Sequence, residues 1–245
     1  MRLYVISCEA LFREVSRAVA LSPHVCDLSF LPFGLHDTPE KLRTEVQSRI
    51  DTASLDERYD HVVLAYGLCS RGTADLHARR LPIVIPKVHD CITLFLGSNE
   101  RYQSEFGEHP GTYYYTSGWI ERKEGDARQG GFEIVHDSRM EERYREYAEK
   151  FGEDNAQFLI EQEKGWLSHY NRAAFINTGL GDQEYYRRFT KHVADSKNWT
   201  CEEIPGDARL IDSLLAGEWN PDEFLIVQPG QRTAERVDAG IIVAL

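Results

Sequence analysis

Short apolar runs alternate with amphipathic segments along the first hundred residues. The runs Leu3–Ile6, His61–Ala65 and Pro82–Ile85 are mostly apolar at consecutive positions, which is typical of strands buried on both faces. Residues 9–21 and 39–50 instead place apolar side chains at helical spacing. We therefore expect an α/β fold of three layers, in which helices cover both faces of a mostly parallel sheet.

The second half of the chain repeats this order of strand and helix. Ala174–Ile176, Cys201–Ile204 and Phe224–Val227 have the composition of strands, and helical patterns lie between them. We interpret the chain as two pseudo-symmetric βαβαβ halves with a helical insert. The expected domains are residues 1–98 as a first half with cysteine-rich strand ends, 99–171 as an aromatic strand and helical insert, and 172–245 as a second half.

The charge balance excludes some classes of partner. The chain has 28 Lys and Arg residues against 40 Asp and Glu, a formal net charge of -12. Such an acidic chain is a poor ligand for nucleic acid or for an anionic membrane surface, because both carry negative charge. No apolar run approaches the length of about 20 residues that spans a bilayer. We expect a cytoplasmic protein without a secretory signal, whose five cysteines stay reduced.

Three of the cysteines follow predicted strands. Cys8 comes after the first strand, Cys69 after the third and Cys91 after the fourth, whereas Cys26 and Cys201 precede theirs. Ligands of open α/β sheets bind at the carboxyl ends of the strands. We therefore expect Cys8, Cys69 and Cys91 to lie together at that edge, and the other two cysteines to lie at the opposite edge.

Two kinds of metal site suit these residues. In extended chain His89 and Cys91 would face the same way, so that with Cys8 and Cys69 they would form a sulfur and nitrogen site for zinc. The three thiolates alone could instead hold a [4Fe-4S] cluster with one iron open to substrate. Ligand softness does not choose between these metals. Without a metal, the cysteines would be small apolar residues that pack in the core, or one of them would be a bare thiol nucleophile.

Other residues are candidates for chemistry or substrate binding. Tyr66 lies close to Cys69 in the sequence, and Glu121 is a candidate general base, although most such carboxylates are solvated. Arg71 is a candidate for binding a carboxylate or phosphate. The segment Asn177–Gly179 follows a strand and opens a helix. The expected catalytic residues are Tyr66 and Glu121, and the expected substrate-binding residues are Arg71, Tyr114, Trp119, Asn177, Thr178 and Gly179.

Several of these motifs together resemble the family known as domain of unknown function 1638. The matching stretches are Tyr66–Cys69, Pro86–Cys91, Pro110–Trp119, Asn177–Asp182 and Pro205–Asp207. The resemblance carries no established activity. It implies a genomic association with corrinoid-dependent methyltransferases. The pair His89 and Cys91 is similar to part of the zinc site of methyltransferases that alkylate thiols, although those enzymes use a (β/α)8 barrel.

The sequence thus predicts a metal-dependent enzyme, a transferase or lyase, that binds a small substrate at a Cys/His-ligated zinc or iron–sulfur site. The resemblance suggests corrinoid-linked one-carbon metabolism, with a corrinoid protein or a methyltransferase as partner. The alternative is a non-catalytic accessory protein of a methyltransferase system that binds a small ligand or a metal. An assay for turnover separates the two.

Overall fold

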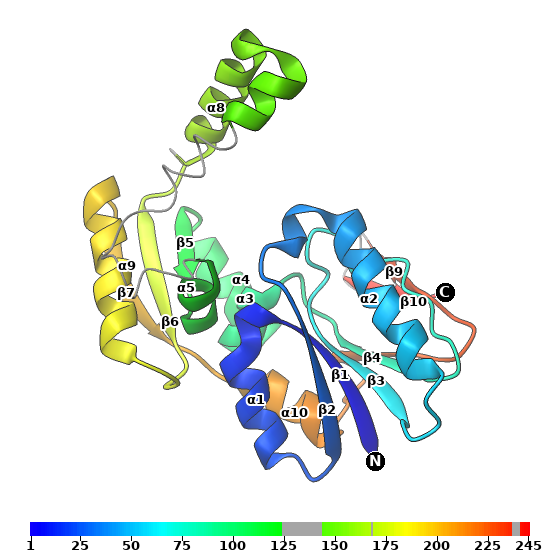
Figure 1. Cartoon of the computed structure of the whole chain (residues 1–245). Coiled ribbons are helices and arrows are strands. Elements are labelled where there is room, and N and C mark those ends of the chain that lie inside the picture. The colour runs from blue at the N-terminus through cyan, green and yellow to red at the C-terminus, as the bar shows by residue number, and fades with distance from the viewer. Residues whose placement is uncertain (124–143, 168, 237–240) are drawn as a thin grey trace.

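A five-stranded sheet forms the larger part of the molecule (Figure 1), with the strand order β2-β1-β3-β4-β8. Its strands are β1 (Arg2–Cys8), β2 (Val25–Leu31), β3 (His61–Ala65), β4 (Ile83–Pro86) and β8 (Phe224–Val227). All neighbours pair in parallel except β8, which runs antiparallel to β4. The computed structural model describes residues 1–123, 144–167, 169–236 and 241–245.

Helices cover both faces of this sheet. On one face α1 (Phe12–Leu21) and α10 (Arg209–Ala216) bury Val15 and Leu214 against the strands. On the other face α2 (Pro39–Ser54) buries Val46. The strands are apolar on both sides because each side meets a helix layer, which confirms the expected α/β class and its mostly parallel pairing.

A second, three-stranded sheet is also parallel. It has the order β5-β6-β7, with β5 (Thr112–Tyr115), β6 (Arg172–Asn177) and β7 (Thr200–Pro205). The helix α9 (Gln183–Lys197) packs on one face through Tyr186 and Phe189. From the other face Ile176 enters the core of the larger sheet. We call the five-stranded sheet with its helices the large lobe, and β5–β7 with α5 (Ser117–Lys123) and α9 the small lobe.

The structure does not show two matching halves. One sheet has five strands and the other three, and β8 leaves the second half of the chain to join β4. In this position β8 is an edge strand of the five-stranded sheet, and its residues Phe224 and Val227 are buried. The aromatic strand of the expected insert becomes β5 of the small lobe.

The other elements connect or extend these lobes. They are η1 (Glu9–Leu11), η2 (Leu35–Asp37), α3 (Cys91–Leu96), α4 (Asn99–Glu108), α8 (Glu153–Leu167), β9 (Thr233–Glu235) and β10 (Ile242–Ala244). In Figure 1 α8 extends away from both sheets. The expected insert also includes residues 124–143, which lie outside the described part of the chain. None of the described helices is both long and apolar enough to cross a bilayer.

The two lobes meet in a close contact between η1 and α5. A Cβ added to Gly118 would lie 1.9 Å from the carbonyl oxygen of Ala10, so only glycine fits there. Beside this contact Arg13 donates two hydrogen bonds of 2.9 and 2.7 Å to the carboxylate of Glu121. These contacts fix the small lobe against the carboxyl ends of the large sheet.

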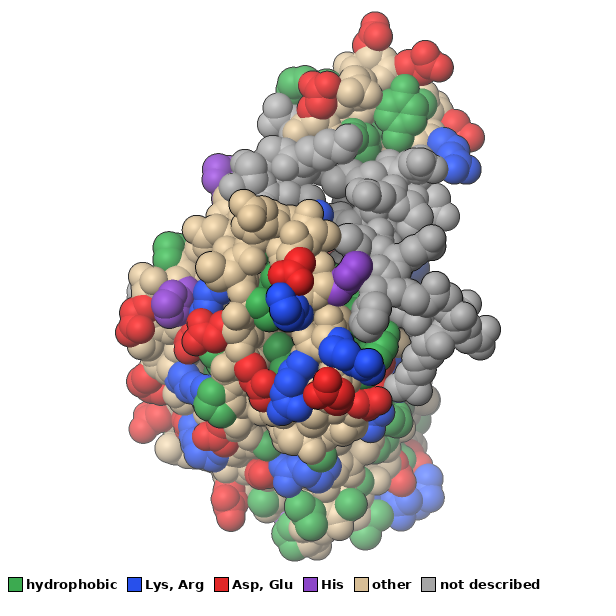
Figure 2. Space-filling model, turned by 90° about the vertical axis from the view of Figure 1, so that its left-hand side faces the viewer, with side chains coloured by type: hydrophobic (Ala, Val, Ile, Leu, Met, Phe, Trp, Pro, Cys, Tyr) green, Lys and Arg blue, Asp and Glu red, His purple; other side chains and the backbone are tan. Residues whose placement is uncertain are grey.

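Opposite charges mix on the outer face of the small lobe. Figure 2 shows basic and acidic side chains interspersed there. Arg187 of α9 pairs with Glu203 of β7 at 2.6 Å, and Lys191 pairs with Asp195 at 2.9 Å. Exposed pairs of this kind add little stability, because water and salt screen them.

Candidate functional site

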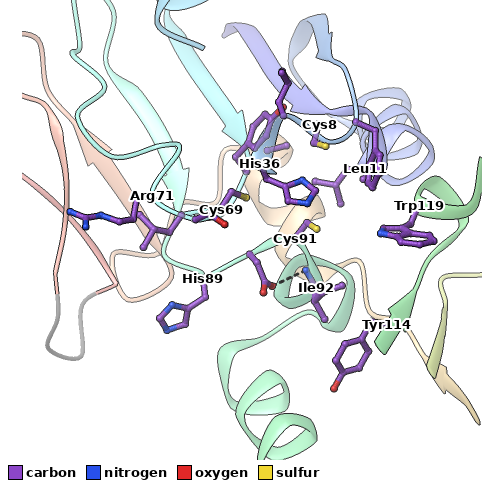
Figure 3. Close-up of a pocket in the computed structure, with 18 of the residues that line it drawn as sticks. Cys8, Leu11, His36, Cys69, Arg71, His89, Cys91, Ile92, Tyr114 and Trp119 are labelled. Atoms are coloured by element: carbon purple, nitrogen blue, oxygen red, sulfur yellow. Dashed lines mark hydrogen bonds between the residues drawn. The ribbon is translucent and has the colours of Figure 1, made fainter. Parts of the chain in front are cut away.

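A cavity of about 520 Å³ lies at the carboxyl edge of the large sheet (Figure 3). Both lobes line it. The large lobe contributes residues that follow β1, β2, β3 and β4, and the small lobe contributes β5 and α5. This is the edge at which open α/β sheets bind their ligands. The size is typical of sites for small molecules.

The three cysteines that follow strands line this one cavity. Cys8 is the last residue of β1, Cys69 follows β3, and Cys91 is the first residue of α3 after β4. Figure 3 shows their sulfur atoms around a common space. Cys26 and Cys201 lie near the amino-terminal ends of β2 and β7 and do not belong to the cavity lining.

Backbone pairing beyond β3 and β4 holds two of these cysteines in place. The amide of Leu68 donates to the carbonyl oxygen of Val88, and the amide of Cys69 donates to that of His89, both at 2.9 Å. The two loops approach so closely that a Cβ on Gly67 would lie 2.7 Å from the Asp90 nitrogen. Glycine is therefore required at position 67.

The loop that carries Cys69 is strained. Cys69, Ser70 and Arg71 have φ angles of 46°, 55° and 71°, which is the left-handed region that residues with a Cβ rarely adopt. Such a residue costs about 1–3 kcal/mol, and strained residues cluster at functional sites. The buried Thr73 hydroxyl donates to the Gly67 carbonyl oxygen at 2.9 Å and helps to hold the loop.

Cys69 is buried and Cys8 and Cys91 are half-buried, and loss of water around each thiol raises its pKa. Burial raises the pKa of Cys69 to about 12, with further increases from the charges of Asp90 and Cys8. The pKa of Cys91 is raised well above its ordinary value by burial, and then by Cys69 and Asp90. Burial also raises the pKa of Cys8. The thiols are therefore neutral at pH 7 unless a cation binds among them.

Asp90 is a half-buried carboxyl group beside the thiols that the sequence analysis did not select. It caps α3 by accepting hydrogen bonds from the amides of Ile92 and Thr93 at 3.0 and 3.3 Å. The hydroxyl of Tyr102 donates to its other oxygen at 3.2 Å. Burial nevertheless raises the pKa of Asp90. An Asp just before a helix is an N-cap signal that the sequence does contain.

Tyr66 points a buried hydroxyl toward the thiols. Its side chain lines the cavity and is 3% exposed. The hydroxyl lies against the Cys8 thiol and has no nitrogen or oxygen partner for a hydrogen bond among the described residues. Its pKa is raised by burial and then by the charges of the three thiols. A buried hydroxyl without such a partner is costly, so this one is available to a ligand in the cavity.

The small lobe supplies an aromatic wall opposite the thiols. Tyr113 and Tyr114 of β5 and Trp119 of α5 line the cavity. Tyr113 contacts Trp119 edge-on, with ring centroids 5.6 Å apart. At the rim Arg71 forms an ion pair of 2.8 Å with Glu235. The cavity lining therefore includes four of the residues selected from the sequence, namely Tyr66, Arg71, Tyr114 and Trp119.

Other candidates from the sequence lie outside the cavity lining. Glu121 pairs with Arg13, and the hydroxyl of Tyr186 donates to it. Asn177 donates to Glu203 at 2.6 Å and accepts from the amide of Gly179. Thr178 donates to the buried carboxylate of Glu14 at 2.7 Å. In the structure these residues join segments of the protein to one another.

The two histidines of the cavity point in different directions. Both His89 and His36 belong to the lining. In Figure 3 the ring of His89 points away from the sulfur atoms, whereas the ring of His36 lies on their side of the cavity. The expected alternation of His89 and Cys91 requires extended chain, but helix α3 begins at Cys91. His36 follows β2 at the same sheet edge, which is the signal that could have found it.

The thiols are not arranged around a single point. Within the described ranges, no three His, Cys, Asp or Glu side chains stand close enough to hold one metal ion. An iron–sulfur cluster requires a different arrangement of ligands, because each thiolate binds a separate iron. Among the described residues, the arrangement therefore does not provide the close set of ligands that a single zinc ion needs.

Fold and site define an α/β protein with a cavity lined by thiols at the carboxyl edge of its parallel strands. Residues 30–215 match the model of the family described as Protein of unknown function (DUF1638). The chain belongs to this family. No curated protein matches the chain, and no solved structure matches it either.

Proposed function

We propose that the protein is an enzyme that holds an iron–sulfur cluster through Cys8, Cys69 and Cys91 and acts on a small molecule in the adjoining cavity. The observation that carries this proposal is that three thiols from three strand ends line one cavity. Three cysteine ligands leave one iron of a [4Fe-4S] cluster without a thiolate. When bound, the cluster would supply a Lewis acid at that iron.

The chain's own residues would bind and orient the substrate. The Tyr66 hydroxyl is buried beside the thiols and can donate a hydrogen bond to a substrate oxygen there. The raised pKa keeps this hydroxyl protonated at pH 7. Tyr113, Tyr114 and Trp119 offer apolar surface and exclude water from the opposite side.

The charge of the site supports a bound cation. Three ionised thiols beside Asp90 would repel one another in a buried place, as the raised pKa values of Cys69 and Cys91 indicate. Cationic iron would neutralise these charges. A site for a bare thiol nucleophile would instead be expected to lower the pKa of one cysteine.

Cysteine variants test the proposal. The protein is reconstituted without oxygen with ferrous iron and sulfide, and bound iron is measured for Cys8→Ala, Cys69→Ala and Cys91→Ala. Cys26→Ala and Cys201→Ala are matched controls, since both residues lie away from the cavity. We expect loss of iron in the first three variants and full iron in the controls.

Full iron binding by the triple variant of Cys8, Cys69 and Cys91 would overturn the proposal. Thermal unfolding of each variant shows whether the fold persists without iron. An accessory protein would bind the cluster and small molecules without turnover, so an assay with hydroxy acids, amines and thiols distinguishes that role from an enzyme.

A further inference from the structure

We infer that the substrate carries an alkylated ammonium group, which lies against an aromatic corner formed by Phe33, Tyr113 and Trp119. The inference rests on the proposed binding of a small molecule in the cavity. All three side chains of the aromatic corner belong to the cavity lining. Each is half-buried, so part of each ring remains accessible.

Trp119 stands nearly at right angles to the other two rings of the aromatic corner. The interplanar angle is 82° with Tyr113 and 79° with Phe33, and the ring centroids lie 5.6 and 6.1 Å apart. Tyr170, which also lines the cavity, stands at 69° to Tyr113. Planes at such angles form a concave corner, in which a rounded group can contact more than one ring.

Both lobes contribute to the aromatic corner. Phe33 follows β2 in the large lobe, and its amide donates to the carboxylate of Glu9 at 3.2 Å. Tyr113 belongs to β5 and Trp119 to α5 of the small lobe. Figure 3 shows the Trp119 ring extending from its helix toward the cavity. The corner therefore lies where the lobes meet and forms one wall of the cavity.

Aromatic rings attract cations because the face of each ring carries negative electrostatic potential. Tryptophan attracts them most strongly, and the attraction increases where water is excluded. An alkylated ammonium group suits such a wall, because its alkyl groups bury apolar surface while its charge meets the ring faces. Enclosure by aromatic side chains is a recognised way to bind quaternary ammonium ligands.

The charges of the cavity lining favour a cation over an anion. Among the described residues of the lining, Arg71 is the one Lys or Arg side chain, and it forms an ion pair of 2.8 Å with Glu235. The half-buried carboxyl group of Asp90 also belongs to the lining. A cationic ligand would therefore meet no unpaired Lys or Arg in this lining, whereas an anion would approach two carboxyl groups.

Tyr66 offers the same substrate a second point of contact. Its hydroxyl lies beside the thiols, and the aromatic corner belongs to the wall opposite them. A molecule with an ammonium group at one end and an oxygen at the other would use both. Choline has this form and is the probe of the test.

Calorimetric titration compares choline with 3,3-dimethylbutan-1-ol, in which a neutral carbon replaces the ammonium nitrogen and the shape stays the same. The full chain is reconstituted with iron and sulfide and titrated with each compound. We expect choline to bind about tenfold more tightly, because only choline carries the charge that aromatic faces attract. Equal affinities, or no binding of choline, would overturn the inference.

Trp119→Leu keeps an apolar side chain but removes the indole face. We expect the preference for choline over the neutral alcohol to fall in this variant. Trp219→Leu is the matched control, because Trp219 is also half-buried but does not belong to the cavity lining. An unchanged preference in a folded Trp119→Leu variant would contradict the assignment.

If thermal unfolding shows that Trp119→Leu does not fold, fluorinated tryptophan replaces tryptophan throughout the natural chain. Fluorine weakens the negative potential of the ring face and changes its shape little. The affinity for choline should then fall with each added fluorine, and an affinity independent of fluorination would overturn the inference.

Bound iron, measured in the same samples, separates this inference from the proposed function. Iron-loaded protein that does not distinguish choline from the neutral alcohol would overturn the inference alone. Natural protein that binds no cluster would overturn the proposed function, and a preference for choline in that protein would still support the aromatic corner as its binding site.

Discussion

The backbone amide of Cys69 donates a hydrogen bond of 2.9 Å to the carbonyl oxygen of His89. This bond extends the pairing of β3 with β4 beyond the ends of both strands. It holds the loop of Cys69 beside the start of α3, where Cys91 lies. The arrangement of two candidate ligands is therefore a consequence of backbone pairing, and it depends on the close approach at Gly67.

Substitution of Gly67 tests this dependence. A Cβ there would lie 2.7 and 2.8 Å from the nitrogen and Cα of Asp90, and backbone atoms cannot move aside cheaply. We expect Gly67→Ala to reduce the free energy of unfolding by about 1–3 kcal/mol and to reduce bound iron. Urea denaturation and iron analysis measure the two effects.

Gly107→Ala is the matched control, because position 107 lies in α4 with nothing within 4 Å of an added Cβ. It should leave iron binding unchanged and increase stability by about 0.5–1 kcal/mol. Equal effects of the two substitutions would contradict the account of Gly67.

In the strained loop of Cys69, a substitution by glycine should increase stability. Ser70 is exposed and has a φ of 55°, a conformation that glycine adopts without strain. We expect Ser70→Gly to increase the free energy of unfolding by up to about 1 kcal/mol, since release of strain exceeds the entropy lost by glycine. Gln103→Gly, in the exposed part of α4, should instead lose about 1 kcal/mol. Destabilisation by both changes would show that residue 70 is not strained.

Glu14 should make the stability of the fold depend on pH. The residue is fully buried, and burial raises the pKa of its carboxyl group although Thr178 and Ser117 donate hydrogen bonds to it. Its other oxygen, Oε2, has no partner among the described residues. In the unfolded chain the same carboxyl group ionises near its ordinary pKa of about 4.3.

The raised pKa means that folding binds a proton at Glu14. The stability that it contributes is complete below a pH of about 4.3 and is lost as pH rises through the folded pKa. The advantage of Glu14→Gln over the natural protein should therefore grow with pH in this window, by about 1.4 kcal/mol for each pH unit, and then level off. Urea denaturation between the acidic and neutral ranges measures both curves. Parallel curves would exclude a raised pKa for Glu14.

The pair of Arg13 and Glu121 should stabilise the contact between the lobes. The pair has two hydrogen bonds and a third partner in Tyr186, whose pKa burial raises to about 12. A double-mutant cycle with Arg13→Ala and Glu121→Ala should give a coupling energy of about 1–3 kcal/mol. The exposed pair of Lys191 and Asp195 should give no measurable coupling. Equal results for the two pairs would contradict a role for Glu121 in joining the lobes.

Much of the fold was predictable because its signals are local. The helix that begins at Pro39, the capping Asp182 before α9 and the left-handed Gly217 after α10 are all visible as sequence patterns. The same holds for the strands that precede Cys8 and Cys69. The edge rule for parallel sheets then predicts a common location for the residues that follow them.

The rest depends on tertiary contacts that have no local signal. The partner of β8 is β4, which is distant in sequence, and a short apolar run does not specify its neighbour. The expected alternation of His89 and Cys91 fails because α3 begins at Cys91, and a sequence pattern does not fix the first residue of a helix. Glu121 accepts a hydrogen bond from Arg13, which lies 108 residues away in the sequence. No local pattern could therefore predict its structural role.

The most direct test of the proposed cluster is the metal and sulfide content of the natural protein, purified without oxygen, together with its absorption spectrum. We predict a brown protein with broad visible absorption and about four irons and four sulfides per chain. A colourless protein with about one zinc per chain, or with no metal, would contradict the proposal.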